Sequence, residues 1–163
     1  MNRRGKNMMS KEKRPNHLTE KIRVIVEGED VQCIKLKKIC KILKENISRY
    51  DWVGFYFVDK VKQDELMLGP FEGEPTEHIR IQFGQGICGQ AAQLKTSYVV
   101  QDVSKEKNYL TCSPNVKSEI VIPIFKKNKI VGELDIDSHS LYAFNGEDKA
   151  FLEKICEIVS RIL

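Results

Sequence analysis

Residues 117–137 read KSEIVIPIFKKNKIVGELDID, and this stretch decides the fold. Two runs in which apolar residues recur at every second position flank the polar segment 126–128. Because successive side chains of a strand point to opposite faces of a sheet, this alternation predicts two strands. The short polar segment between them predicts an antiparallel hairpin of strands 117–125 and 129–137.

The register of this hairpin follows from its apolar faces. The isoleucines of both strands must share one face, because a slip by a single residue would expose them. With a three-residue turn at 126–128, Glu119 lies opposite Asp135. A slip of two residues places Glu119 opposite Asp137 or Glu133 instead. Every allowed register therefore sets Glu119 beside a second carboxylate.

Glu133, Asp135 and Asp137 alternate with apolar residues, so their side chains lie on one face of the second strand. Like charges at neighbouring sheet positions are destabilising. One interpretation is a solvated face, where water or a nearby lysine relieves the repulsion. The other is a pocket floor that holds a cation, such as the ammonium group of a free amino acid.

Two aromatic residues accompany this face. Trp52, which is the only tryptophan, and Tyr56 are four residues apart on a predicted strand and therefore share one of its faces. They form either part of the core or a wall against which a ligand stacks.

The remaining sequence predicts further strands and helices around the hairpin. Aromatic and β-branched runs indicate strands, and apolar residues at spacings of three and four indicate helices. The expected strands are 51–58, 65–71, 78–83 and 97–101, and the expected helices are 17–26, 31–48 (with Asp30 as N-cap), 88–94 and one that begins at Asn145 or Gly146. This pattern is typical of an α+β protein, with a six-stranded, mainly antiparallel sheet that carries the long helices on one face.

Length and charge narrow the possible functions. The 163 residues suit one domain, and the formal charge of +4 is concentrated at the start of the chain. Residues 1–14 carry +5, which leaves −1 for the rest, so a nucleic-acid groove is not expected. We interpret residues 1–15 as a disordered basic tail, with contact to RNA or a membrane as the alternative, and residues 16–163 as one domain. Neither a secretory signal nor a membrane span of ~18 apolar residues is found, so we expect a cytoplasmic protein.

The chain has five cysteines at wide spacings and no CxxC pair, so the spacing does not predict a metal site. Cys33, Cys40 and Cys156 lie on the apolar stripes of expected helices and are predicted core residues. Cys88 follows a glycine turn at the start of a short helix. Backbone N–H groups at that position favour a thiolate.

The glycine turn itself, GQGICG at 84–89, matches the GxGxxG pattern of dinucleotide-binding proteins. The preceding strand alternates apolar and polar residues, whereas the first strand of a dinucleotide-binding domain is apolar throughout. The following helix is also short for a crossover, and Asp102 comes too early for the usual acid. We therefore reject a nucleotide site.

Five ordered blocks resemble the free methionine-(R)-sulfoxide reductases, a family of stand-alone GAF-domain proteins. The blocks are YDWVGFY (50–56), LGPF (68–71), GQGICGQAA (84–92), TCSPNVKSEI (111–120) and GELDIDS (132–138). The resemblance spans residues 16–163 and implies a GAF fold. It implies reduction of free methionine-R-sulfoxide by thiols, without a bound cofactor, and recycling of the oxidised enzyme by thioredoxin. It also implies a homodimer, although the sequence indicates no interface.

The same resemblance implies residue roles. Cys112 matches the cysteine that attacks the sulfoxide, and Cys88 matches the resolving cysteine. Trp52 and Tyr56 match the aromatic wall around the sulfoxide methyl group. The pocket acids, which hold the substrate ammonium and one of which protonates the sulfoxide oxygen, match Glu119, Asp135 and Asp137.

One position departs from the family pattern. Many members carry a third cysteine ten residues before the position of Cys88, and here that residue is His78, which we interpret as a loop or strand-start residue. Cys88 must then resolve Cys112 alone, or an external thiol must do so. The alternative function is a GAF module that senses an amino-acid-like ligand without catalysis. The pair Cys88 and Cys112, which a sensor does not need, favours the enzyme.

Overall fold

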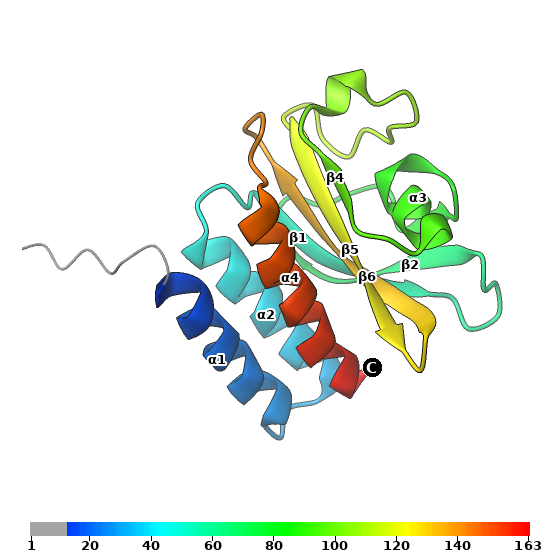
Figure 1. Cartoon of the computed structure of the whole chain (residues 1–163). Coiled ribbons are helices and arrows are strands. Elements are labelled where there is room, and N and C mark those ends of the chain that lie inside the picture. Colours follow the sequence, from blue (N-terminus) through cyan, green and yellow to red (C-terminus); the bar gives the residue numbers. More distant parts are fainter. Residues whose placement is uncertain (1–12) are drawn as a thin grey trace, which may run out of the picture.

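Six strands form one antiparallel sheet in the order β3-β2-β1-β6-β5-β4 (Figure 1). The structure is a computed structural model that describes residues 13–163. The strands are β1 (Trp52–Val58), β2 (Glu65–Glu72), β3 (Arg80–Gln82), β4 (Tyr98–Val100), β5 (Ser118–Lys126) and β6 (Lys129–Ser138). The helices are α1 (Lys13–Glu27), α2 (Gln32–Asn46), α3 (Gly86–Leu94) and α4 (Gly146–Val159), with short 3-10 turns at Val103–Lys105 and Ser160–Ile162. Every predicted strand and helix is present, and the α+β class is confirmed.

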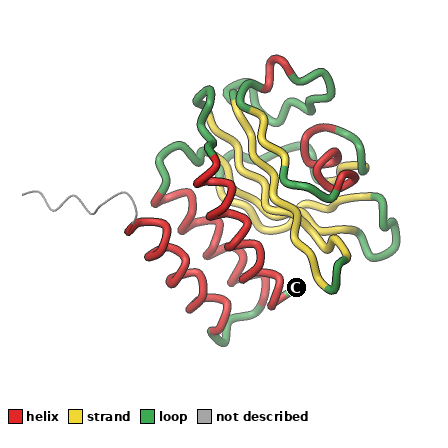
Figure 2. Tube along the Cα trace, viewed as in Figure 1, coloured by secondary structure: helices red, strands yellow, loops and turns green. Residues whose placement is uncertain are grey.

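The helices divide between the two faces of the sheet. The long helices α1, α2 and α4 lie side by side on one face, as predicted, whereas the short α3 lies on the other (Figures 1 and 2). Because residues opposite each other in a ladder share a face, Phe55 and Leu134 point toward the long helices, and their neighbours Tyr56 and Glu133 point toward α3. The face under α3 therefore receives the acids of β6.

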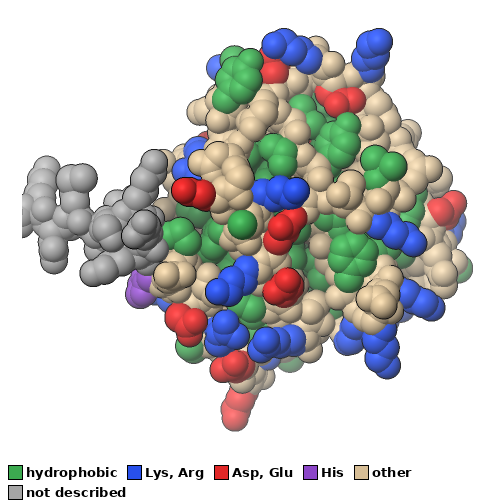
Figure 3. Space-filling model, in the orientation of Figure 1, with side chains coloured by type: hydrophobic (Ala, Val, Ile, Leu, Met, Phe, Trp, Pro, Cys, Tyr) green, Lys and Arg blue, Asp and Glu red, His purple; other side chains and the backbone are tan. Residues whose placement is uncertain are grey.

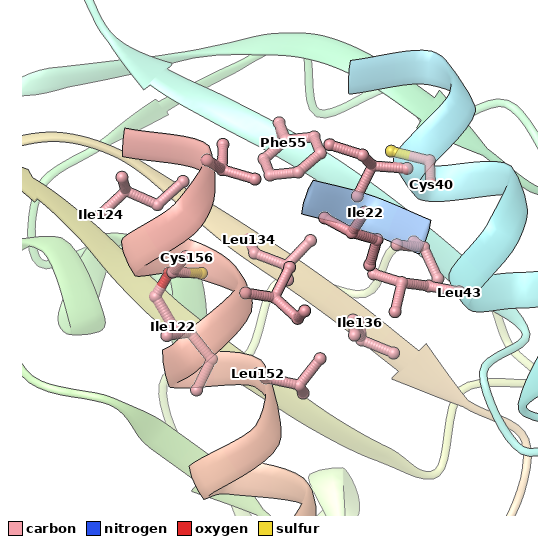
Figure 4. Packing of buried hydrophobic residues seen from close by; sticks show 14 of the residues in the cluster. Ile22, Cys40, Leu43, Phe55, Ile122, Ile124, Leu134, Ile136, Leu152 and Cys156 are labelled. Atoms are coloured by element: carbon pink, nitrogen blue, oxygen red, sulfur yellow. The ribbon is translucent and has the colours of Figure 1, made fainter. Parts of the chain in front are cut away.

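The main core lies between the sheet and the three long helices. Figure 4 shows Cys40 and Cys156 among the apolar side chains of this core, next to strand residues such as Phe55 and Ile122. Both thiols are almost fully buried, which confirms them as core residues. The prediction for Cys33 is wrong, because this residue is exposed. The first turn of α2 extends past the packed part of the sheet, and Cys33 lines an open cleft of about 800 Å³ near the Val58 end of β1.

Two helix starts can be compared with the sequence, which predicts a start at Asn145 or Gly146 for α4 and an Asp30 cap for α2. Asn145 precedes α4 and forms a reciprocal capping box: its Oδ1 accepts from the Asp148 backbone N–H at 3.0 Å, and Asp148 Oδ2 accepts from the Asn145 N–H at 2.9 Å. The predicted Asp30 cap of α2 is wrong. Val31 occupies the N-cap position without a side-chain hydrogen bond, and the Asp30 carboxylate pairs with Lys38 instead.

The β5–β6 hairpin has a two-residue turn, so the predicted three-residue turn is wrong. Lys127 and Asn128 adopt φ values of 50° and 62°, the left-handed pair that matches the twist of two antiparallel strands. An irregularity between Ile124 and Phe125 then shifts the pairing. As a result Glu119 lies opposite Asp137, one of the two alternatives to Asp135. Ile120, Ile122, Ile124 and Ile136 lie on the side of the long helices, whereas Ile130 packs against the cluster on the α3 side, so the expectation of one shared face is wrong for Ile130.

The start of the chain is described only from Lys13, where α1 begins inside the predicted tail 1–15. The prediction of disorder for residues 1–12 lies outside the described residues. On the face shown in Figure 3, basic and acidic side chains are interspersed. Within residues 13–163, no helix combines the length and the apolar character needed to cross a bilayer.

Candidate active site

Four carboxyl groups lie together between the sheet and α3. Glu119 of β5 pairs with Asp137 of β6, and Glu133 and Asp135 continue along the same face of β6. Their side chains are buried, with exposed fractions of 0–3%. In the described part of the chain, none of the four takes part in an ion pair. The interpretation of a solvated face is therefore wrong.

Burial makes these acids hold their protons. It is the largest cause that raises the pKa of Asp135 to about 7, and it raises the pKa of Glu119, Glu133 and Asp137 well above the usual range. The neighbouring carboxyl of Asp135 raises the pKa of the other three further. At neutral pH the cluster therefore contains neutral acids that can donate protons, beside one group that is about half ionised.

Cys88 lies in the first turn of α3 and borders this cluster. Its Sγ is 3.9 Å from Glu119 Oε1, and the side chain is 5% exposed. Burial, followed by the charges of Asp135, Glu133 and Glu119, raises the pKa of the thiol well above its usual value. The prediction of a thiolate is therefore wrong. A helix terminus contributes at most about 2 kcal/mol, which burial and three acids outweigh.

The glycine loop before Cys88 serves packing. Gly84 and Gly86 adopt φ values of 85° and 65°, which favour glycine. A side chain at Gly89 would collide with the carbonyl oxygen of Gln82, so glycine lets α3 approach β3 closely. The Gly86 N–H donates to Asn108 Oδ1 at 3.0 Å. The positive φ angles and the close contact of Gly89 therefore explain the glycines of the GxGxxG pattern.

Cys112 lines a small pocket of about 30 Å³ at the edge of the cluster, together with Trp52, Thr76, Val116 and Asp137. Its thiol is half-buried, and Sγ lies 3.6 Å from the Leu110 carbonyl oxygen. Burial, followed by the charges of Asp137, Asp135 and Glu119, raises the pKa of this thiol. Cys112 shares this pocket with Asp137, and Cys88 Sγ lies 3.9 Å from Glu119, which pairs with Asp137, so both thiols border the acid cluster.

The two predicted wall residues differ in position. Trp52 lines the small pocket, and its ring centroid lies 6.4 Å from that of Tyr56. Trp52 Nε1 donates to the Glu74 carbonyl at 3.0 Å, and the Tyr56 hydroxyl donates to the His78 carbonyl at 2.9 Å. Trp52 therefore forms the wall itself, whereas Tyr56, which is 1% exposed, supports it from within the core.

His78 lies in the loop before β3, as predicted, and reaches the segment that carries Cys112. Its Nε2 is 3.1 Å from the carbonyl oxygen of Thr111. Together with the Tyr56 bond, this contact ties the wall and the Cys112 loop to one residue.

Several residues that line the pocket were not predicted from the sequence. Asp51 lines it, accepts a 2.7 Å hydrogen bond from the His139 N–H, and adds to the raised pKa of Asp137 after burial and Asp135. Thr76 also lines it. Asp51 could have been found, because it directly precedes the strand that carries Trp52. The loop position of Thr76 carries no comparable signal.

Comparisons with known proteins identify the family of this chain. The GAF domain family model matches residues 36–163. The free methionine-R-sulfoxide reductase of Escherichia coli (strain K12) is 32% identical over 146 residues, which cover 90% of this chain and 86% of the relative.

Solved structures extend the likeness. The free methionine-R-sulfoxide reductase from Neisseria meningitidis in complex with its substrate has a TM-score of 0.88 and 33% identity, and covers 99% of this chain and 95% of that one. The fRMsr of Staphylococcus aureus in complex with substrate has a TM-score of 0.82 and 38% identity, with 91% and 95% covered. The chain therefore belongs to the GAF-domain family and, within it, to the free methionine-R-sulfoxide reductases.

Proposed function

We propose that this protein reduces free methionine-R-sulfoxide to methionine with its own thiols. The observation that carries the proposal is that two cysteines border one cluster of buried, mostly neutral acids, and that Cys112 and Asp137 line the same pocket beside Trp52. A sulfoxide reductase needs a thiol nucleophile and a proton donor for the departing oxygen.

The first step joins Cys112 to the substrate. The Cys112 sulfur attacks the sulfoxide sulfur while a neutral carboxyl of the set Glu119, Asp135 and Asp137 protonates the sulfoxide oxygen. The oxygen passes to Cys112, which becomes a sulfenic acid, and methionine leaves with its sulfur reduced. The proton of the Cys112 thiol returns to the carboxyl set, which is thereby restored.

The second step consumes the sulfenic acid. The Cys88 sulfur attacks Cys112, a disulfide forms, and the oxygen leaves as water. The two protons of that water come from the two thiols, so the acids act as carriers and are not consumed. Thioredoxin reduces the disulfide and closes the cycle. The homodimer and the cytoplasmic location stay predictions.

The acids also account for selection of a free amino acid. An ammonium group placed among Glu119, Asp135 and Asp137 gives these buried groups the positive partner they lack in residues 13–163. A blocked or peptide-bound methionine sulfoxide has no such group. Since the pocket holds about one water molecule, entry of the substrate requires the segments that line it to open, among them 74–76 and 112–116.

The test is a coupled assay with purified protein, thioredoxin, thioredoxin reductase and NADPH. We expect consumption of NADPH with free methionine-R-sulfoxide and none with the free S form or with the N-blocked R form. Binding of the free R form without turnover would overturn the proposal in favour of the sensor. Equal turnover of the blocked form would overturn the assigned role of the acids.

A further inference from the structure

One member of the acid cluster, Glu133, has no role in the proposed reaction. The substrate contributes a single positive charge, whereas four carboxyl groups and the Cys88 thiol face the same buried space. Both oxygens of Glu133 and Oδ1 of Asp135 have no hydrogen-bond partner in the described part of the chain. Buried polar atoms in proteins are hydrogen-bonded or bind a ligand, so these unpartnered oxygens indicate a further ligand.

Three potential ligand atoms converge there from three elements of the fold. They are Sγ of Cys88 on α3, a carboxylate oxygen of Glu119 on β5 and a carboxylate oxygen of Asp135 on β6, and all lie within 4.8 Å of one another. An ion among three atoms at this spacing is at most about 2.8 Å from each. An inward shift of roughly 0.5–0.8 Å by each ligand then gives the bond lengths of zinc.

We propose that Cys88, Glu119 and Asp135 form a binding site for Zn²⁺. A thiolate with carboxylates suits zinc, whereas magnesium and calcium require oxygen ligands alone. Glu133 lies two residues from Asp135 on the same face of β6, and its charge raises the pKa of the Cys88 thiol. It is therefore placed to supply a fourth ligand. On binding, Cys88, Glu119 and the protonated fraction of Asp135 lose their protons to the buffer, and a Zn–S bond and two Zn–O bonds form in place of the S–H and O–H bonds.

Zinc and catalysis exclude each other at this site. Zinc-bound Cys88 cannot attack the sulfenic acid of Cys112, and zinc-bound Glu119 and Asp135 cannot hold an ammonium group. Zinc therefore inhibits turnover and competes with the substrate. This inhibition rests on the proposed reductase function, whereas zinc binding itself does not.

The test measures binding of the metal alone. The full-length protein, reduced and freed of metal, is titrated with ZnCl₂ against a chromogenic chelator. We expect one Zn²⁺ per chain, and a loss of affinity of at least about tenfold in Cys88→Ser, Glu119→Gln and Asp135→Asn. Cys112→Ser is the matched control, since it removes a thiol beside the same acids that is not in the ligand set, and it should bind zinc like the parent.

A second measurement keeps the inference testable if a variant fails to fold. In the unaltered protein, ZnCl₂ should slow alkylation of Cys88 relative to Cys112, as mapped by mass spectrometry, and MgCl₂ should not. Equal affinity in Cys88→Ser, or alkylation of Cys88 that zinc does not change, overturns the site. If zinc binds as described and methionine is never formed, the proposed reductase function alone fails. If methionine is formed and zinc does not bind, this inference alone fails.

Discussion

The Nε2 atom of His78 lies 3.1 Å from the carbonyl oxygen of Thr111, the residue that precedes Cys112. The His78 side chain therefore reaches the backbone next to Cys112, the thiol that we propose attacks the substrate. Since position 78 is that of a third cysteine in many family members, a cysteine here should form a disulfide with Cys112.

We therefore expect His78→Cys to rescue the resolving step. In the Cys88→Ser background, His78→Cys should restore thioredoxin-dependent turnover, and peptide mapping should find a disulfide between positions 78 and 112. His78→Ser in the same background is the matched control and should remain inactive. Failure of the cysteine to restore turnover, in a folded double variant, would show that position 78 does not reach Cys112 during the cycle.

Serine variants of the two cysteines should separate formation of methionine from formation of the disulfide. Cys112→Ser should form no methionine at all. Cys88→Ser should form one methionine per chain and stop, because Cys112 then stays a sulfenic acid that dimedone traps. The measurements are the methionine formed without reductant and the mass of the labelled Cys112 peptide. The opposite pattern would reverse the assigned roles of the two cysteines.

Asp137 should contribute mainly to substrate binding. It lines the pocket and is 2% exposed, so Asp137→Asn removes a charged partner of the ammonium group. Such a loss costs about 1.5–3 kcal/mol, which predicts a KM increase of roughly ten- to hundredfold. Asp59→Asn makes the same change at a carboxylate that pairs with Arg80 outside the pocket and should leave KM unchanged. A large fall in the Tm of Asp137→Asn would instead indicate a structural role.

Gly54 should be needed for the position of the aromatic wall. A Cβ atom at Gly54 would collide with the Trp52 ring and would lie 2.9 Å from Cβ of Phe71. Gly54→Ala should therefore displace the ring and lower both kcat/KM and Tm, with an expected loss of stability of about 1–3 kcal/mol. Because Trp52 is the only tryptophan, its fluorescence reports the displacement directly. Gly146→Ala, where an added Cβ meets nothing within 4 Å, is the control and should leave the spectrum unchanged.

The reactivity of Cys112 should rise with pH. Burial, and after it the Asp137 charge, raises the pKa of the thiol, so at neutral pH nearly all of it is protonated. Below that pKa the thiolate fraction grows about tenfold with each pH unit, and the rate of alkylation should follow it. The rate is read by mass spectrometry, with the exposed Cys33 as internal reference. Asp137→Asn should accelerate the reaction at a given pH, and a rate independent of pH from 6 to 9 would contradict the assigned environment.

The sequence predicts most of the fold because the relevant patterns are local. The alternation from Ile120 to Ile124 and the helix start at Asn145 or Gly146 are visible in neighbouring residues, and both elements form as expected. The predicted length of the hairpin turn is wrong because the pairing register shifts by one residue after Ile124. An alternating pattern does not reveal such a shift. The predicted burial of Cys33 is wrong because this residue lines an open cleft, although its helix position matches the apolar spacing.

The site is predicted in part. The acids of β6 and their pairing with Glu119 follow from alternation, and the structure brings them together with Cys88 and Cys112. The protonation of Cys88 could not be predicted, because it depends on burial beneath a helix and on acids 31 or more residues away. The proposed zinc ligands could not be predicted from sequence spacing either, since they come from three separate elements of the fold.

The sheet works as a partition between two kinds of packing. On one side, helices α1, α2 and α4 enclose the apolar core that holds the fold together. On the other, a second apolar cluster, to which α3 and the segment between β4 and β5 contribute, surrounds four buried acids that a stability-optimised protein would replace with apolar residues. The buried acids thus lie on the sheet face opposite the main core. Exchanging these acids for apolar side chains of similar size should give a more robust but inert protein, a trade-off between stability and activity built into the architecture.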